Sequence, residues 1–343
     1  MNPFPATRLL FALALAAQSM NVLAIAPGRM FDKTVLAINA RDEQGNVLGL
    51  TQHDDALSAL PEALRITPED ATDAAALVSA YRELLHIKTE DVDAWSNLGD
   101  LLASLDRYDD AILAYREALR INPEHATAWN NLGSVYNSLE RYDDAISAFR
   151  QALRIEEPDD PYVWYNLGVS HAGHHQYDAA VSAYGEALRI NPHLAAAWTN
   201  LGIACYDLER YDDSISAFRH LLRLEPENAD GWYNLGTAYA VLDRHDDAIH
   251  AYREALRINP EHGSAWLNLG RSYNLLKRYG DAISAYRAAV RVDPKRAKAW
   301  NALAITYVQS GNLAAALQAV EGLRPIDPAE ADKLLKQITR PGK

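Results

Sequence analysis

Apolar and polar positions along most of the chain repeat with the spacing of amphipathic helices. In ATAWNNLGSVYNSLERYDDAISAFR, residues 126–150, an apolar stripe spaced by three and four residues predicts a first helix, helix A. Its members are Trp129, Leu132, Gly133, Tyr136 and Leu139. A second stripe begins after an aspartate pair that suits a helix N-terminus, and it predicts a second helix, helix B. Its members are Ala145, Ile146, Ala148, Phe149, Ala152 and Leu153.

This pair of helices recurs along the chain with a fixed period. All seven tryptophans are 34 residues apart, except for one interval of 35. The pattern predicts seven repeats, at 92–125, 126–160, 161–194, 195–228, 229–262, 263–296 and 297–330. The segment at 329–340 is expected to be a capping helix with charges that face water.

The repeated residues resemble the tetratricopeptide repeat (TPR): Trp-x-x-Leu-Gly-x-x-Tyr, then Ala-x-x-x-Phe/Tyr, then Pro, with a period of 34. The resemblance covers Val92 to Glu330. It implies an all-α fold, a right-handed superhelical solenoid of about seven helical hairpins. The A helices would line a concave groove that binds peptides, and the resemblance implies no catalytic chemistry and no cofactor.

An asparagine occupies the sixth position of helix A in six repeats. At 100° per residue this position lies about 140° from the stripe centred near Trp129, Leu132 and Tyr136, so we expect its amide to be exposed in the groove. A ladder of amides could bind the main chain of an extended peptide, or each amide could instead satisfy a neighbouring loop or helix end. The ladder comprises Asn97, Asn131, Asn166, Asn200, Asn234 and Asn268.

The other groove positions vary and are candidates for specificity. The middle repeats carry apolar and aromatic residues, which are favoured interface anchors, with acidic residues before them and basic residues after them. The central candidates are Tyr162, Tyr165, Val169, Ile203, Tyr206 and Tyr233. Asp93 and Asp100 precede them, and Arg271 and Lys298 follow them.

The third repeat departs from the others in SHAGHHQYD, residues 170–178. His171 and His175 are expected to be one helical turn apart, and Cys205 has the position of His171 in the next repeat, so metal binding is conceivable. No fourth ligand is evident. Gly173 and Gly185 weaken helices, so the favoured interpretation is a locally soft repeat without a metal.

The residues before the array predict an exported protein. Arg8 precedes the apolar run Leu9 to Ala17, which resembles a secretory signal peptide (1–24) cleaved after Ala24 and is too short to span a bilayer. Residues 25–54 contain a β-hairpin pattern, and 55–91 form a degenerate helical lead-in. Residues 27–52 resemble the opening strands of secreted trypsin-like proteases, but no Gly-Asp-Ser-Gly nucleophile motif follows.

Composition narrows the class of partner. The chain has 33 basic and 46 acidic residues and a formal net charge of −13, which disfavours nucleic-acid and anionic-membrane partners. We therefore expect a non-enzymatic scaffold, periplasmic or extracellular, that holds a protein or peptide and is not inserted in a membrane. The alternative is a regulatory or targeting subunit of a hydrolase, or the remnant of a protease–TPR fusion.

Overall fold

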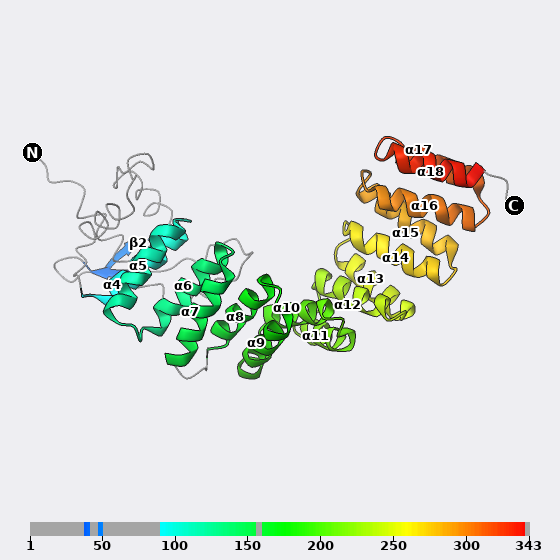
Figure 1. Ribbon diagram of the computed structural model, residues 1–343. Helices are drawn as coiled ribbons and strands as arrows, with labels where there is room; N and C mark the ends of the chain where they lie inside the picture. The colour runs from blue at the N-terminus through cyan, green and yellow to red at the C-terminus, as the bar shows by residue number, and fades with distance from the viewer. Residues whose placement is uncertain (1–37, 42–46, 51–89, 156–159, 340–343) are drawn as a thin grey trace, which may run out of the picture. The chain divides into compact units, whose positions relative to one another are not determined.

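The computed structural model describes residues 38–41, 47–50, 90–155 and 160–339. Two short strands, β1 (Ile38–Arg41) and β2 (Val47–Leu50), pair in antiparallel register with Ile38 opposite Leu50. The predicted signal peptide and nearly all of the predicted lead-in lie outside the described residues. The rest of the described chain is helical, which confirms the all-α TPR fold (Figure 1).

Fifteen helices follow one another in the described part of the chain, alternating between A and B. The A helices are α4 (Val92–Ser104), α6 (Ala126–Ser138), α8 (Pro161–Gly173), α10 (Ala195–Asp207), α12 (Ala229–Val241), α14 (Gly263–Leu275) and α16 (Ala297–Gln309). The B helices are α5 (Tyr108–Ile121), α7 (Tyr142–Ile155), α9 (Tyr177–Ile190), α11 (Tyr211–Leu224), α13 (His245–Ile258), α15 (Tyr279–Val292) and α17 (Leu313–Leu323). The array ends with α18 (Pro328–Thr339).

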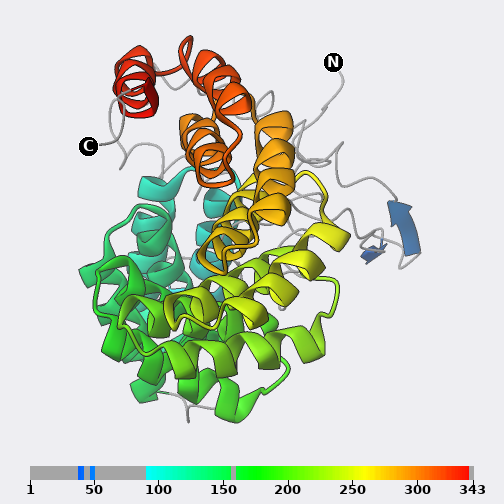
Figure 2. The ribbon, with the colours of Figure 1, turned by 90° about the vertical axis from the view of Figure 1, so that its right-hand side faces the viewer.

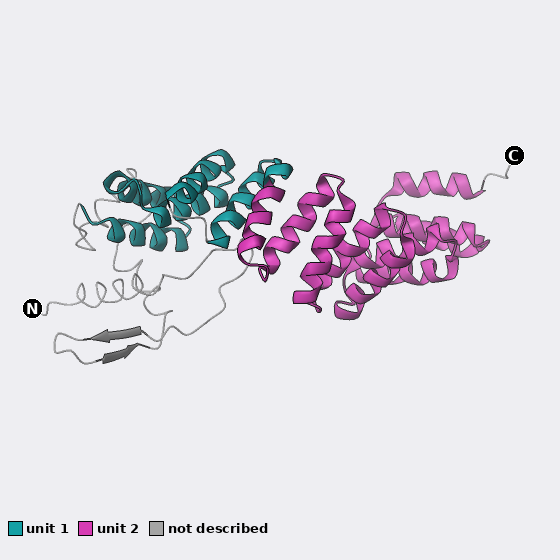
Figure 3. Ribbon diagram, turned by 90° about the horizontal axis from the view of Figure 1, so that it is seen from below, with its two compact units in different colours: residues 1–179 teal, residues 180–343 magenta. Residues whose placement is uncertain are grey.

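The chain divides into two compact units, which are treated separately below (Figure 3). The N-terminal unit, residues 1–179, contains α4 to α8, and the C-terminal unit, residues 180–343, contains α10 to α18. The division falls inside α9. In each unit a B helix packs against the A helix that precedes it and against the A helix that follows it, as the neighbouring ribbons in Figure 2 illustrate.

A glycine facing an aromatic ring sets the close approach of the two helices within a repeat. A Cβ built on Gly133 would lie 2.8 Å from the Phe149 ring, and one on Gly270 would lie 2.6 Å from the Tyr286 ring. The last repeat has the reverse combination, because Ala304 occupies the glycine position and the smaller Val320 the aromatic position, and both are fully buried. The two positions together therefore fill a similar volume, as close packing requires.

The turn between helix A and helix B contains one residue in the left-handed backbone conformation. In the described repeats these residues, all with positive φ, are Asp106, Glu140, His175, Glu209, Asp243, Lys277 and Gly311. The amide of the next residue closes the turn, as where Arg107 N–H donates to the Leu102 carbonyl at 2.9 Å. Of these, only Gly311 is a glycine, so the other six turns hold a strained conformation that glycine would relieve.

The buried stripe of helix A is broader than the sequence pattern indicated. The third and tenth positions are buried in most repeats, as Ala128 and Val135 are in α6, because helix A packs against helices on two sides. Leu242 and Leu276, at the fourteenth position, are more than one third exposed, although the pattern assigned this position to the core. The sixth position is a helical neighbour of positions three and ten, so it borders the core.

Candidate functional site

The A-helix face is the surface formed by positions 2, 5, 6, 9, 12 and 13 of successive A helices. Within the N-terminal unit α4 contacts α6, and α6 contacts α8. Within the C-terminal unit α10, α12, α14 and α16 contact one another in the same consecutive way. The A helices are therefore neighbours in each unit, and all the predicted groove residues occupy these positions, although they differ in exposure.

A half-buried carboxylate engages the amide ladder in the N-terminal unit. Asp100, at position 9 of α4, accepts a hydrogen bond from the Tyr115 hydroxyl at 2.6 Å and another from Asn131 Nδ2 at 2.7 Å, both at Oδ1. Burial raises the pKa of Asp100, and the two hydrogen bonds oppose this effect. Burial also raises the pKa of Tyr115 well above its usual range, and the Asp100 charge adds to the increase. The Asn131 amide is thus held by the protein itself.

Asn166 differs from the exposed amide that the helical angle indicated. Its side chain is only 5% exposed, because position 6 borders the buried third and tenth positions. The main-chain carbonyl of Asn166 accepts hydrogen bonds from Ser170 Oγ at 2.9 Å and from Asn137 Nδ2 at 3.3 Å. Ser170 Oγ also lies 2.7 Å from Asn137 Oδ1. This network ties α6 to α8 below the surface.

The remaining candidates of the N-terminal unit differ in exposure. Asn97 and Val169 are half-buried. Tyr165 is 6% exposed and belongs to the core, whereas Tyr162 is 41% exposed and belongs to the surface. Of the two tyrosines predicted for the groove in this unit, Tyr162 is therefore the one that a partner can reach.

The equivalent positions of the C-terminal unit are occupied differently. Ile203, at position 9 of α10, has no polar group, and Phe218, which has the place of Tyr115 in this repeat, has no hydroxyl. The half-buried amide of Asn234 on α12 makes no hydrogen bond with the described residues. Asn200 is likewise half-buried. The Asn234 amide is available for a ligand, in contrast to that of Asn131.

A tyrosine cluster follows on α12, α13 and α14. Asn268 Nδ2 donates to the Tyr233 hydroxyl at 3.3 Å, and the Tyr252 hydroxyl reaches Thr237 Oγ1 at 3.4 Å. Burial raises the pKa of Tyr252 to about 12, so its hydroxyl keeps its proton at neutral pH. Tyr206 is half-buried, and its ring meets that of Tyr211 edge-on at 5.3 Å. Tyr233 and Asn268 thus form a polar patch on this face.

Exposed apolar side chains extend this face beyond the predicted candidates. Val241 is 43% exposed, Leu275 is 53% exposed and Ile305 is 41% exposed, at positions 13, 13 and 9 of their helices. Val308, at position 12 of α16, is 36% exposed, and the predicted Ile203 is 42% exposed. These five side chains form the apolar strip. Apolar residues at positions 9, 12 and 13 are the sequence signal for it, and the sequence analysis names only Ile203 among the five as a groove residue.

The two predicted basic residues are exposed on the same face. Arg271 lies at position 9 of α14 and Lys298 at position 2 of α16. Neither lies within ion-pair distance of a carboxylate among the described residues. Burial raises the pKa of Tyr286 to about 12, and the charge of Arg271 opposes this shift.

The structure does not bring the candidate metal ligands His171 and His175 together on one helical face. His171 is buried and its Nδ1 lies 2.7 Å from Gln176 Oε1, whereas His175 lies beyond the end of α8 at positive φ, with Nδ1 3.0 Å from the Tyr177 hydroxyl. Burial lowers the pKa of His171 and raises that of Cys205. Among the residues that the structure describes, no three His, Cys, Asp or Glu side chains form a metal-binding group.

Gly173 was interpreted as a sign of a relaxed repeat, and the structure gives a different reason for it. A Cβ on Gly173 would collide with the ring of Tyr142 on α7. Gly173 therefore makes room for an aromatic contact between α7 and α8. A Cβ on Gly185, in contrast, would have no described atom outside its own helix turn within 4 Å.

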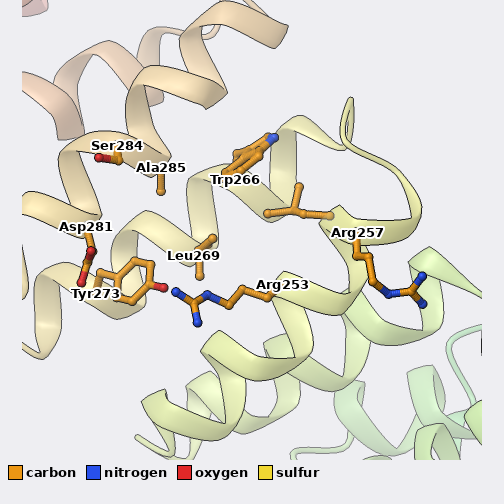
Figure 4. A pocket seen from close by; sticks show the side chains of 9 residues that line it. Arg253, Arg257, Trp266, Leu269, Tyr273, Asp281, Ser284 and Ala285 are labelled. Carbon is orange, nitrogen blue, oxygen red and sulfur yellow. The ribbon is translucent and has the colours of Figure 1, made fainter.

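A crevice on the B-helix side of the C-terminal unit lies among α13, α14 and α15. Its volume is about 440 Å³, and Figure 4 shows Arg253 pointing toward Tyr273 while Arg257 points away from it. The Arg253 guanidinium lies 5.7 Å from the Tyr273 ring centroid. Arg257 forms ion pairs with Glu227 at 2.8 Å and Glu254 at 2.9 Å. The crevice is thus separate from the A-helix face and has one of its two cations already paired.

Paired helices with a repeated Trp, Gly and aromatic framework define a TPR-type solenoid. A family model described as the cilia and flagella-associated protein 70 C-terminal domain matches residues 51–230, which is more than half of the chain. Two tetratricopeptide repeat models match residues 206–260 and 233–291, and residues 274–338. The chain belongs to the tetratricopeptide repeat family. No curated protein matches it significantly.

Solved structures show the same fold. The C-terminal part of a TPR repeat-containing protein from Cytophaga hutchinsonii aligns with a TM-score of 0.63 at 18% identity, over 70% of this chain and 98% of that one. PilF of Pseudomonas aeruginosa aligns with a TM-score of 0.50 at 19% identity, over 62% and 97% of the two chains. YrrB, described as a TPR protein with an unusual peptide-binding site, gives 0.49 at 27% identity, over 56% and 97%. In the described part of this chain, no helix is both long and apolar enough to cross a membrane.

Proposed function

We propose that this protein is a non-catalytic interaction scaffold that holds an extended segment of a partner protein on its A-helix face. The observation that carries the proposal is the strip of exposed apolar side chains in the C-terminal unit. Its members are Ile203, Val241, Leu275, Ile305 and Val308. Large apolar residues grouped on one face of a protein mark interaction sites, because exposing them to water is unfavourable.

The polar groups beside this strip suit a peptide main chain. The Asn234 amide has one acceptor and two donors and makes no hydrogen bond with the described residues. An extended peptide has unpaired carbonyl and N–H groups along both edges, which such an amide can satisfy without regard to side-chain identity. In the N-terminal unit, Tyr162 is the exposed anchor for the same purpose.

The proposal is tested by photo-crosslinking in cells. A photoreactive amino acid at Ile203 or at Leu275 should capture the same partner, and mass spectrometry should map both crosslinks to one short extended segment. Ser216, exposed on α11 of the same unit, is the matched position away from the A-helix face and should not capture it. Equal capture from all three positions, or none from Ile203 and Leu275, would refute the proposal. Hydrolase activity that copurifies with the captured complex would favour a regulatory subunit.

We also propose that the protein is exported and begins at Ile25 after cleavage. The support is the sequence pattern of Arg8 followed by a short apolar run and a cleavage site at Ala24. N-terminal sequencing of protein purified from the producing cells tests it. An intact Met1 in that protein would exclude cleavage and with it this proposal. The resemblance of residues 27–52 to protease strands stays a prediction.

A further inference from the structure

Two tryptophans of the C-terminal unit are covered by a ring from the helix B of their own repeat. His220, at position 10 of α11, stacks on Trp198 with ring centroids 4.4 Å apart and planes 8° from parallel. His250, at position 6 of α13, meets Trp232 edge-on, with ring centroids 6.0 Å apart. Positions 6 and 10 of helix B therefore face the tryptophan of the same repeat.

The sixth repeat carries no ring at either of these positions. Ser284 and Ala288 occupy positions 6 and 10 of α15, and among the seven repeats only this one has small residues at both. The Ser284 hydroxyl donates to the Gly280 carbonyl at 3.0 Å, so it is turned onto its own helix. Ser284 and the tryptophan of this repeat, Trp266, both line the crevice among α13, α14 and α15 (Figure 4). The crevice therefore includes the place that a histidine ring has in the fifth repeat.

The apolar side of the crevice is preformed. Trp266 is half-buried, and its Nε1 donates to the Pro260 carbonyl at 2.8 Å, which fixes the orientation of the indole ring. Leu269, which also lines the crevice, is 3% exposed. The crevice volume of about 440 Å³ lies within the range of small-molecule sites. A planar ring can therefore stack on Trp266 as the His220 ring stacks on Trp198.

Two hydrogen-bond donors converge at the polar side of the crevice. The Arg253 guanidinium lies 5.7 Å from the centroid of the Tyr273 ring, and Figure 4 shows the Tyr273 hydroxyl pointing toward it. Neither polar group makes a hydrogen bond or an ion pair with the described residues. In the equivalent pair of the N-terminal unit, by contrast, Arg116 Nη2 donates to the Tyr136 hydroxyl at 3.1 Å. Arg253 and Tyr273 are thus open to an anion.

The carboxylates beside the crevice are already paired with other cations. Asp281, which also lines the crevice, forms an ion pair with Arg278 at 2.8 Å. Glu254 forms an ion pair with Arg257 at 2.9 Å. The charge of Arg253 is therefore left for a ligand, and a ligand that reaches both sides of the crevice combines a flat apolar ring with an acid group.

We infer that this crevice binds a small planar aromatic acid. The ring of the ligand stacks on Trp266, where the preceding repeats have histidine rings of their own. The carboxylate of the ligand accepts hydrogen bonds from Arg253 and from the Tyr273 hydroxyl. The site lies on the B-helix side, so it is independent of the binding proposed for the A-helix face.

Titration of the full chain with cinnamate, followed by the indole N–H resonances of the tryptophans, tests this inference. Trp266→Phe assigns one of these resonances, and it should shift most, because the ligand ring lies over that indole. Cinnamamide has the same ring without the charge and should bind about tenfold more weakly, since it loses charge-assisted hydrogen bonds. Cyclohexanepropionate has the charge without a planar ring and should also bind more weakly than cinnamate.

Two variants and two matched controls locate the site. Ser284→His introduces the side chain that the fifth repeat has at this position, so it should fill the crevice and abolish the shift at Trp266. Arg253→Gln should remove the preference for cinnamate over cinnamamide. The controls are Ser216→His and Arg219→Gln on α11, and both should leave binding unchanged. Arg219 also lies 5.7 Å from a tyrosine ring centroid, but it does not line this crevice.

Circular dichroism checks that the variants are folded. Equal binding of cinnamate and cinnamamide, no shift at millimolar cinnamate, or binding that survives Ser284→His would each overturn the inference. The blocked peptide acetyl-Gly-Asp-Phe-Gly-amide presents an acid group and an aromatic ring from a protein chain. If this peptide bound at the crevice more tightly than cinnamate, the ligand would be a protein segment and the assignment to a small acid would be wrong.

Discussion

Three equivalent positions carry different residues in the two units: position 9 of one helix A, the aromatic position of the following helix B, and position 6 of the next helix A. In the N-terminal unit, Asp100 at position 9 bonds both Tyr115 and the ladder residue Asn131. In the C-terminal unit, Ile203 and Phe218 have those places, and the Asn234 amide makes no hydrogen bond with the described residues. In these two pairs of repeats, the residue at position 9 distinguishes a ladder amide that is bonded within the fold from one that is not. A repeated asparagine has no single role.

What the units share is the glycine–aromatic contact, and breaking it gives the largest expected effect. Gly133→Ala and Gly270→Ala should each destabilise their unit by about 1–3 kcal/mol, because the new Cβ collides with Phe149 or Tyr286. Chemical denaturation with hydrogen exchange of the affected helices measures both. Tyr286→Val should cost less stability in the Gly270→Ala background than in the native chain, since Ala304 and Val320 occupy these two positions in the last repeat. Unequal losses in the two units would show that their packing is not equivalent.

The amide comparison gives the next effect. Asn131→Ala removes a donor from a half-buried carboxylate and should cost about 0.5–1.5 kcal/mol of stability. Asn234→Ala removes no internal bond and should change the thermal midpoint little, while it weakens peptide binding. Thermal unfolding of the two variants side by side measures the difference. Equal destabilisation by both would mean that Asn234 also has a structural role.

Asp100 should also make the stability of the N-terminal unit depend on pH, whereas Ile203 at the equivalent position of the C-terminal unit cannot titrate. Because its pKa is raised in the folded state, mainly by burial, the folded state binds more protons than the unfolded state in the pH range between the ordinary pKa of about 4 and the raised pKa. The contribution of Asp100 to the free energy of unfolding therefore falls as the pH rises through the raised pKa. Asp100→Asn keeps an acceptor for Tyr115 and Asn131 and removes the titration, so its thermal midpoint should improve relative to the native chain from pH 4 to pH 7. A constant offset across that range would contradict the assignment.

The fold was predictable because the same sequence pattern recurs in each repeat. Seven tryptophans at one period, glycines at position 8 and breaks at proline together indicate the paired helices. The site was less predictable because burial depends on neighbours. The helical angle measured from Trp129 placed Asn166 opposite the core, but helix A packs on two sides and position 6 borders both. Likewise, nothing in the pattern around Gly173 indicated that Tyr142 occupies the space of its missing side chain.

The smallest expected effect compares two glycines of the third repeat, one in each unit. Gly185 is exposed in the middle of α9 with no atom near its Cβ position, so Gly185→Ala should raise stability by about 0.5–1 kcal/mol through helix propensity alone. Gly173 is the last residue of α8, so Gly173→Ala gains less from helix propensity, and it forces the Tyr142 ring to move, so it should be neutral or destabilising. Thermal midpoints and hydrogen exchange of α8 and α9 measure both. If Gly173→Ala stabilised as much as Gly185→Ala, the ring contact would be unimportant and the third repeat would be soft, as its sequence indicated.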